Sequence, residues 1–295
     1  MTALDETPRT SEARTARQRH SSAVAVAARY GRALRTPRGT AGAAIVLTIV
    51  VLALSAPLLF PGGYDVQGRD ALAGPSLLAP FGTDELGRNV FIRSIYGART
   101  DLSLVAIAVP VAALVGTLLG LLGAVNRTLG VVAMRFLDLI MGFPSLILGI
   151  CVALVLAPGW GALVIAMTIY ALPAFGRLAR ATLLGQEQRD YVLAARMLGV
   201  GRGQIMVRHV LPHTVDTMIA QAVVAVTASI FLESALSIVG LGVQPPNPSL
   251  GVLLNSGARY MEQQPFYVLG PAALLFLLVL GFSLLADAIT RKGTR

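Results

Sequence analysis

Charged residues are scarce in this chain. Asp, Glu, Lys and Arg make up 13% of its 295 residues, whereas hydrophobic residues make up 55%. A soluble domain carries about 25% charged residues, so the low charge and the positive mean hydropathy argue against an ordinary soluble fold. The composition therefore predicts an all-α, polytopic membrane protein that is embedded in a lipid bilayer.

Residue types that carry much of enzyme chemistry are also nearly missing. The one cysteine, Cys151, lies inside an apolar run, so it can form no intrachain disulfide and suggests no metal cluster. The only lysine is Lys292, and no GxxxxGK[ST] phosphate-binding loop occurs. The three histidines show no zinc-binding spacing and complete no Ser/His/Asp set. We therefore predict no catalytic residues, no cofactor and no metal in this chain.

The positive charge that is present does not point to nucleic acid. The net charge is +9, but the basic residues gather in the N-terminal region and in short loops between apolar runs. That distribution is the positive-inside pattern of membrane proteins. Residues 1–38 are predicted to be a basic cytoplasmic tail, partly disordered, rather than a cleaved signal.

Six apolar runs approach the length of about 20 residues that a bilayer-spanning helix needs. They cover residues 39–61, 102–126, 136–157, 160–176, 217–241 and 268–286. The second run holds a GxxxG pattern at Gly116 and Gly120, which in membrane helices often marks a close helix–helix contact. The sequence predicts six transmembrane helices within a domain of residues 39–290, followed by a short C-terminus, residues 291–295.

The basic residues also predict an orientation. If the N-terminus is cytoplasmic, 19 of the 24 Lys and Arg residues fall inside and 5 fall outside. Both termini are therefore predicted to be cytoplasmic.

Two outside segments are longer than a simple turn. In residues 61–100, Thr83 or Asp84 is predicted to cap a helix that runs through Ile95 and rests at the membrane surface or over the bundle. Its apolar face would contain Leu86, Val90, Phe91 and Ile95. In residues 242–267, the sequence Pro245-Pro246-Asn247-Pro248 predicts a rigid loop that cannot be regular helix.

The longest inside loop, residues 177–213, has a helical pattern followed by glycines. Four residues share one helical face: Tyr191, Ala194, Ala195 and Leu198. Gly199 is predicted to break this helix, and a second apolar and basic stretch, residues 205–210, stops at Pro212. We predict a helix–turn–helix on the cytoplasmic side, where small side chains allow another protein's backbone to approach closely.

This loop resembles the cytoplasmic signature of permease subunits of bacterial ATP-binding-cassette (ABC) importers. That signature is Glu-Ala-Ala, three residues, Gly, and a stretch that ends in Leu-Pro, which Ala194, Ala195, Gly199, Leu211 and Pro212 match in spacing. Leu193 stands where the family has Glu, although Glu187 and Asp190 lie on nearby turns. The resemblance implies an ATPase-coupling loop with these residues: Asp190, Tyr191, Leu193, Ala194, Ala195, Gly199, His209, Leu211 and Pro212.

Further motifs are similar to the second permease of dipeptide and oligopeptide importers. They are Phe81–Val90 with Tyr96–Arg99, Phe143–Leu146, Leu236–Pro246, and His209 before Val210-Leu211-Pro212. The resemblance covers residues 57–288 and implies a type I ABC importer permease fold with a core module at about residues 100–288. It also implies a related permease partner, cytoplasmic ATPases that bind ATP and Mg²⁺, and an external solute-binding protein.

Glu233 is an ionisable residue within the fifth apolar run, which makes it a candidate for the translocation path. A structural Glu that is hydrogen-bonded to a neighbouring helix or to the partner is the alternative. For the cargo, peptides are the main prediction, with glutathione and nickel chelates as alternatives. An ATP-independent channel or carrier would need a chain of intramembrane ionisable groups or inverted repeats, for which Glu233 alone is too little.

Overall fold

The computed structural model of the chain describes residue 31 and residues 34–201 and 211–291. Most of the predicted N-terminal tail lies outside these residues. The helices are α2 (Pro37–Leu59), α3 (Val90–Val125), α4 (Arg127–Met141), α5 (Ser145–Leu156), α6 (Trp160–Glu187), α7 (Asp190–Met197), α9 (Leu211–Ile238), α10 (Leu250–Ala258) and α11 (Phe266–Arg291). The prediction of an all-α protein is confirmed, since the described residues add only one isolated β-bridge, Thr83–Asn89.

Five helices are long and apolar enough to cross a membrane: α2, α3, α6, α9 and α11. A sixth span would have to combine α4 and α5, which meet at a bend of 95°. The predicted third span, residues 136–157, is therefore sharply bent and consists of two helices. Pro144 supplies the reason, because a proline disfavours helical backbone at the preceding residue, Phe143, and lacks the N–H that a continuous helix needs.

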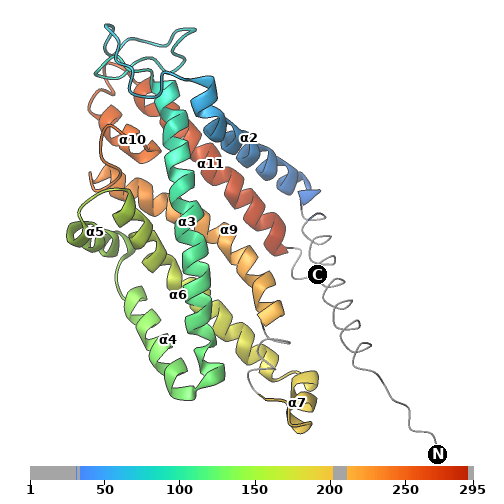
Figure 1. Ribbon diagram of the computed structural model, residues 1–295. Coiled ribbons are helices and arrows are strands. Elements are labelled where there is room, and N and C mark those ends of the chain that lie inside the picture. The colour runs from blue at the N-terminus through green and yellow to red at the C-terminus, as the bar shows by residue number, and fades with distance from the viewer. Residues whose placement is uncertain (1–30, 32–33, 202–210, 292–295) are drawn as a thin grey trace, which may run out of the picture.

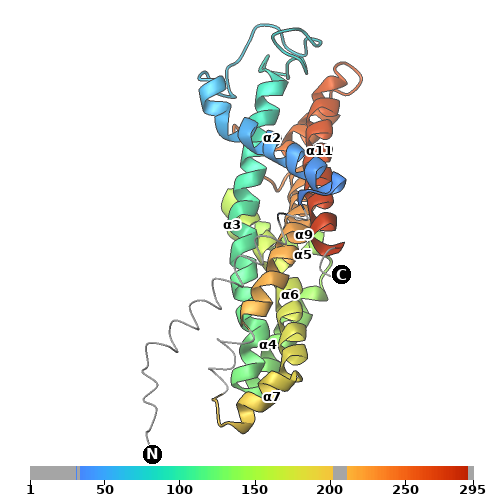
Figure 2. The ribbon, with the colours of Figure 1, turned by 90° about the vertical axis from the view of Figure 1, so that its right-hand side faces the viewer.

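The helices form an elongated bundle with two different ends (Figures 1 and 2). Residues 60–89 and α10 lie at one end, here called the loop end. The helix α7 lies at the opposite end, here called the α7 end. Between them, α3, α6 and α9 supply most of the buried apolar core, and α2 packs beside α11.

The glycines of the GxxxG pattern lie in the most extensive helix–helix contact of the molecule, between α3 and α6. A Cβ atom at Gly116 would lie 2.6 Å from the carbonyl oxygen of Leu172, and one at Gly120 would overlap that of Gly176. Because glycine lacks this atom, the two backbones approach closely. The predicted helix–helix contact is confirmed.

The long loop before α3 differs from the prediction. The helix starts at Val90 and not near Asp84, since the side chain of Asn89 caps it by accepting hydrogen bonds from the backbone N–H groups of Phe91 (3.0 Å) and Ile92 (3.3 Å). Gly87 has φ +71°, a left-handed conformation that interrupts any helix starting earlier. The predicted surface helix is therefore absent from this loop, and Ile95 belongs to the 36-residue α3.

Three further boundaries depart from the sequence pattern. The helix α6 continues to Glu187, so the first part of the predicted inside loop is helical. Pro212 lies within α9, which is described from Leu211 onward. The predicted non-helical Pro245–Pro248 segment is confirmed, but the helix that follows it, α10, was not predicted; Ser249 caps it by accepting from Val252 N.

Candidate functional site

The helix α7 is attached to the bundle by one side. Val192 is fully buried, whereas Ala194 on the same helix is exposed. At the end of the helix, Met197 and the following residue, Leu198, expose 89% and 83% of their surface. An exposed, small and apolar surface of this kind is available for another protein.

The predicted break after α7 is present. The helix ends at Met197, and Gly199 has φ +76° with no atom within 4 Å of the position a Cβ would take. Asp190, Tyr191, Leu193 and Ala195 lie on α7, and Leu211 and Pro212 open α9. His209 and the stretch at residues 205–210 lie outside the described residues, so the predicted second helix is not tested.

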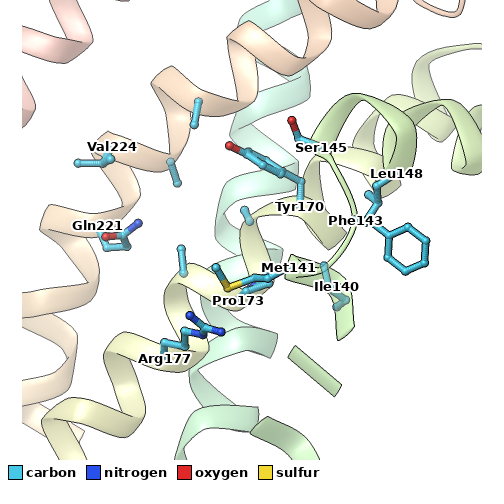
Figure 3. A pocket seen from close by; sticks show the side chains of 14 residues that line it. Ile140, Met141, Phe143, Ser145, Leu148, Tyr170, Pro173, Arg177, Gln221 and Val224 are labelled. Atoms are coloured by element: carbon cyan, nitrogen blue, oxygen red, sulfur yellow. The ribbon is translucent and has the colours of Figure 1, made fainter. Parts of the chain in front are cut away.

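A cavity of about 380 Å³ opens between α6, α9 and the α4–α5 bend (Figure 3). Its walls are mainly apolar, and Figure 3 shows Val224 of α9 across the cavity from Met141 at the end of α4. The polar side chains that line it are Ser145, Tyr170, Arg177 and Gln221. Such a pocket, apolar with a few polar groups, can bind a small organic molecule.

One ion pair lies at this cavity. Arg177 of α6 donates to Asp138 of α4 at 2.7 Å, and both side chains are partly exposed. Arg135 approaches the same carboxylate at 3.9 Å. The pair joins two walls of the cavity, and its partial exposure leaves Arg177 accessible to a negatively charged ligand.

Glu233 does not line the cavity. It is fully buried in α9, nearer the loop end, and accepts a hydrogen bond of 2.7 Å from Ser237 Oγ and one of 3.4 Å from Ser234 Oγ. Sequence reasoning missed its neighbour Asp101, which is buried in α3 and interacts electrostatically with Glu233. Asp101 directly precedes the second apolar run, so hydropathy placed it at a span boundary.

The loop end is held together by a buried ionic cluster. Asp84, which is fully buried, accepts from Arg88 Nε at 2.7 Å and lies 3.4 Å from Arg93 Nε. Burial opposes the charged form of Arg88, but hydrogen bonds to Asp84 and Asp65 outweigh it and raise the pKa of Arg88 above its ordinary value. The hydroxyl of Tyr267 in α11 donates to Glu85 at 2.7 Å and so ties this loop to the bundle.

Comparison with known families gives one match, to the binding-protein-dependent transport system inner membrane component, over residues 116–294. The di/tripeptide transport system permease protein DppC of Pseudomonas aeruginosa is 39% identical over 257 residues, which cover 84% of each chain. The dipeptide transport system permease protein DppC of Alkalihalophilus pseudofirmus is 34% identical over 250 residues, 84% of this chain and 82% of the relative.

A third relative has a different named cargo. The glutathione transport system permease protein GsiD of Pectobacterium atrosepticum is 35% identical over 265 residues, 88% of this chain and 87% of the relative. Among solved structures, a chain of the MetNI methionine ABC transporter in inward-facing conformations matches with a TM-score of 0.54 at 20% identity. The match covers 68% of this chain and 95% of that chain, and at this identity the likeness concerns the fold alone.

Proposed function

The chain belongs to the family of binding-protein-dependent transport system inner membrane components, and we propose that it forms the translocation path for di- and oligopeptides together with a second permease. It is an ABC importer permease, a multi-pass membrane protein. The observation that carries the peptide cargo is its 39% identity to a di/tripeptide permease over 84% of each chain.

The cavity beside the α4–α5 bend is the part of this chain best suited to a peptide. Its apolar walls accommodate side chains of varied shape, and the hydroxyl groups of Ser145 and Tyr170 can hydrogen-bond to a peptide backbone. Arg177 offers a cation for the C-terminal carboxylate of the peptide. Glu233 is fully buried and does not line this cavity, so its contribution to the translocation path stays a prediction.

Glutathione is the second candidate cargo. A glutathione permease is 35% identical to this chain over 87% of its own length. Glutathione is itself a small peptide with carboxylate groups, so the same cavity and the same Arg177 would serve it.

Energy would come from partner subunits. We assign the binding of ATP and Mg²⁺ to cytoplasmic ATPases and the capture of solute to an external binding protein. The coupling residues are Asp190, Tyr191, Leu193, Ala194, Ala195, Gly199, His209, Leu211 and Pro212. ATP-driven closure of the ATPases would carry α7 with it and open the bundle outward, and hydrolysis would reset it, as a two-state rigid-body device.

This mechanism requires the α7 end to be cytoplasmic. Basic residues favour that orientation, with both termini inside. A topology reporter inserted at residue 203 or fused after Arg295 should read cytoplasmic, and one inserted near Asp70 should read external. A cytoplasmic signal near Asp70 contradicts the orientation.

The cargo is tested by uptake into a strain from which this chain has been deleted. Labelled dipeptide and tripeptide should enter only when the wild-type chain is restored, at least tenfold faster than in the deletion strain. Labelled glutathione and nickel serve as parallel substrates. Loss of glutathione uptake alone selects the second candidate, and peptide uptake unaffected by the deletion contradicts the proposed cargo.

A further inference from the structure

Two carboxyl side chains are buried where α3, α9 and α10 meet. Asp101 of α3 is 1% exposed, and Glu233 of α9 is 0% exposed. Both helices are apolar enough to span a membrane. Within residues 34–201 and 211–291, no Lys, Arg or His forms an ion pair with either carboxyl. A buried charge without a partner is costly, so the question is how two carboxyl groups are accommodated here without a cation.

The hydrogen bonds of the two groups differ. Both oxygens of Glu233 accept from serine hydroxyls, those of Ser237 at 2.7 Å and Ser234 at 3.4 Å. Asp101 accepts through Oδ2 from the backbone N–H of Leu250 at 3.3 Å. Its other oxygen, Oδ1, is buried and has no donor among the residues described. Glu233 is therefore satisfied as a carboxylate, and Asp101 is not.

The two carboxyl groups belong to one cluster. Asp101 accepts from the N–H of Leu250 at the start of α10, and Glu233 accepts from Ser237, which lies beside the same start of α10. In addition, the hydroxyl of Ser249, the residue before Leu250, lies 3.4 Å from the hydroxyl of Ser237 that binds Glu233. A continuous set of polar groups thus connects Asp101 to Glu233 through the start of α10.

A proton resolves both difficulties. If both carboxyl groups were ionised, two negative charges would repel each other in an apolar interior with no water to screen them. Protonation of one removes a charge, and Asp101, whose Oδ1 has no donor among the described residues, is the group less stabilised as an anion. We propose that this cluster holds one proton, with Asp101 as the neutral acid and Glu233 as the carboxylate.

A metal cation is the competing ligand, and the donors argue against it. A cation needs several oxygen lone pairs directed at one point. Here Asp101 Oδ2 accepts from the N–H of Leu250 and Glu233 Oε1 accepts from the hydroxyl of Ser237, so at least two of the four acidic oxygens already face hydrogen atoms. Within the described residues, no third Asp, Glu, His or Cys joins the two carboxyls as a metal ligand.

A proton on Asp101 would also favour the close packing of α10 between its neighbours. A Cβ at Gly251 would lie 2.7 Å from Cβ of Ser237, and a Cβ at Gly97 would lie 3.0 Å from the carbonyl carbon of Ser249. The backbone of α10 therefore touches both α9 and α3 beside the two carboxyl groups. Repulsion between two ionised carboxylates would separate these elements. This role concerns the bundle itself and does not depend on the identity of the cargo.

Infrared spectroscopy of the assembled transporter in lipid at neutral pH tests the proposal, because the carbonyl stretch of a protonated carboxyl is separate from the carboxylate bands. We expect this band in the wild type. It should disappear in Asp101→Asn, shift in Glu233→Gln and remain in Asp138→Asn, a control carboxylate at the surface. Absence of the band in the wild type overturns the proposal, as does a band that Asp101→Asn leaves unchanged.

Thermal unfolding of the same complex provides a second readout. Asparagine resembles a neutral aspartic acid, so Asp101→Asn should lower the melting temperature by less than about 3 °C, whereas Asp101→Ala should lower it several times more. Equal losses overturn the proposal. Replacing choline chloride by the chloride of Na⁺, K⁺ or Mg²⁺ should leave the melting temperature of the wild type unchanged. A rise that is lost in Asp101→Asn shows a cation in place of the proton and also overturns it.

Discussion

The loop end and the α7 end of the bundle are built in opposite ways. At the loop end, the buried carboxylate of Asp84 pairs with the buried guanidinium groups of Arg88 and Arg93. Asp84 and Arg88 belong to the non-helical residues 60–89. At the α7 end, the small Ala194 and the apolar Met197 and Leu198 are exposed, next to exposed polar residues such as Asp190. The buried charges of the loop end find their partners within this chain, whereas the α7 end presents a surface for another protein to cover.

The difference lies in where the stabilising contacts come from. A buried ion pair holds its loop in one arrangement, since breaking it leaves an unpaired charge in the interior. The exposed face of α7 has no such partner in its own chain among the described residues, and a docking protein could bury it. Substitutions at the loop end should therefore cost stability, and substitutions at the α7 end should cost transport.

Asp84→Ala should give the largest loss of stability. It removes the hydrogen-bond acceptor of the Arg88 side chain, the carboxylate that pairs with Arg93, and the acceptor for the backbone N–H groups of Leu86 and Arg88, both at 2.9 Å. Two buried guanidinium groups lose their buried partner and keep only partly exposed carboxylates such as Asp65, so the free energy of unfolding should fall by about 3–5 kcal/mol. Thermal unfolding of the purified transporter measures the change.

Asp65→Ala is the matched control for that variant. Asp65 also pairs with Arg88, at 3.0 Å, but its side chain is 46% exposed. The loss there should stay below about 1 kcal/mol, since solvent screens the pair. Equal losses of stability in the two variants would contradict the claim that burial makes the Asp84 ion pairs stronger than that of Asp65.

Two glycines with the same backbone conformation should behave differently. Gly87 has φ +71° and Gly199 has φ +76°, so alanine is strained by roughly 1 kcal/mol at either position. At Gly87 the new Cβ would also lie 2.5 Å from the carbonyl oxygen of Gly68, whereas at Gly199 it meets nothing. Gly87→Ala should therefore lower the melting temperature more. The reverse order would contradict the contrast between a packed end and an open one.

Ala194→Arg should have almost no effect on stability and should abolish transport. Ala194 is exposed on α7, so the chain itself can accommodate the larger side chain, but an ATPase groove could not accept its bulk and charge. Uptake of labelled dipeptide and substrate-stimulated ATP hydrolysis should both fall at least tenfold, while assembly with the partner permease continues. Gln188→Arg, at an exposed position outside α7, adds the same charge as a control. Normal uptake in Ala194→Arg would exclude α7 as the docking surface.

Several features of the fold follow from local sequence alone. Apolar length placed five spanning helices correctly, and the Pro245–Pro248 segment is non-helical as predicted. Gly199 ends α7 because glycine alone adopts a left-handed conformation without strain. Membership of the transporter family was also readable from motif order. These properties depend on residues close together in the chain, so the sequence displays them directly.

Other features arise only when distant residues meet. Hydropathy predicted that the third span continues through Pro144. In the structure the chain bends there by 95°, and the bend forms a wall of the cavity. Capping by Asn89 in place of Asp84 was hidden because both residues can cap a helix, and the folded loop uses Asp84 to pair with Arg88 and Arg93 instead.

The same division between local and tertiary information separates the α7 surface from the cluster of Asp101 and Glu233. The amino-acid sequence by itself determined that this is an all-α membrane permease and where its exposed α7 helix lies, since apolar runs and glycine positions are local signals. Only the tertiary structure joined Asp101 and Glu233 to one cluster, because the packing of α3, α9 and α10 brings Leu250, the donor to Asp101, and Ser249 next to Ser237, the donor to Glu233. A carboxyl at a predicted span boundary can hold a proton, as proposed for Asp101, when the fold buries it without a cationic partner.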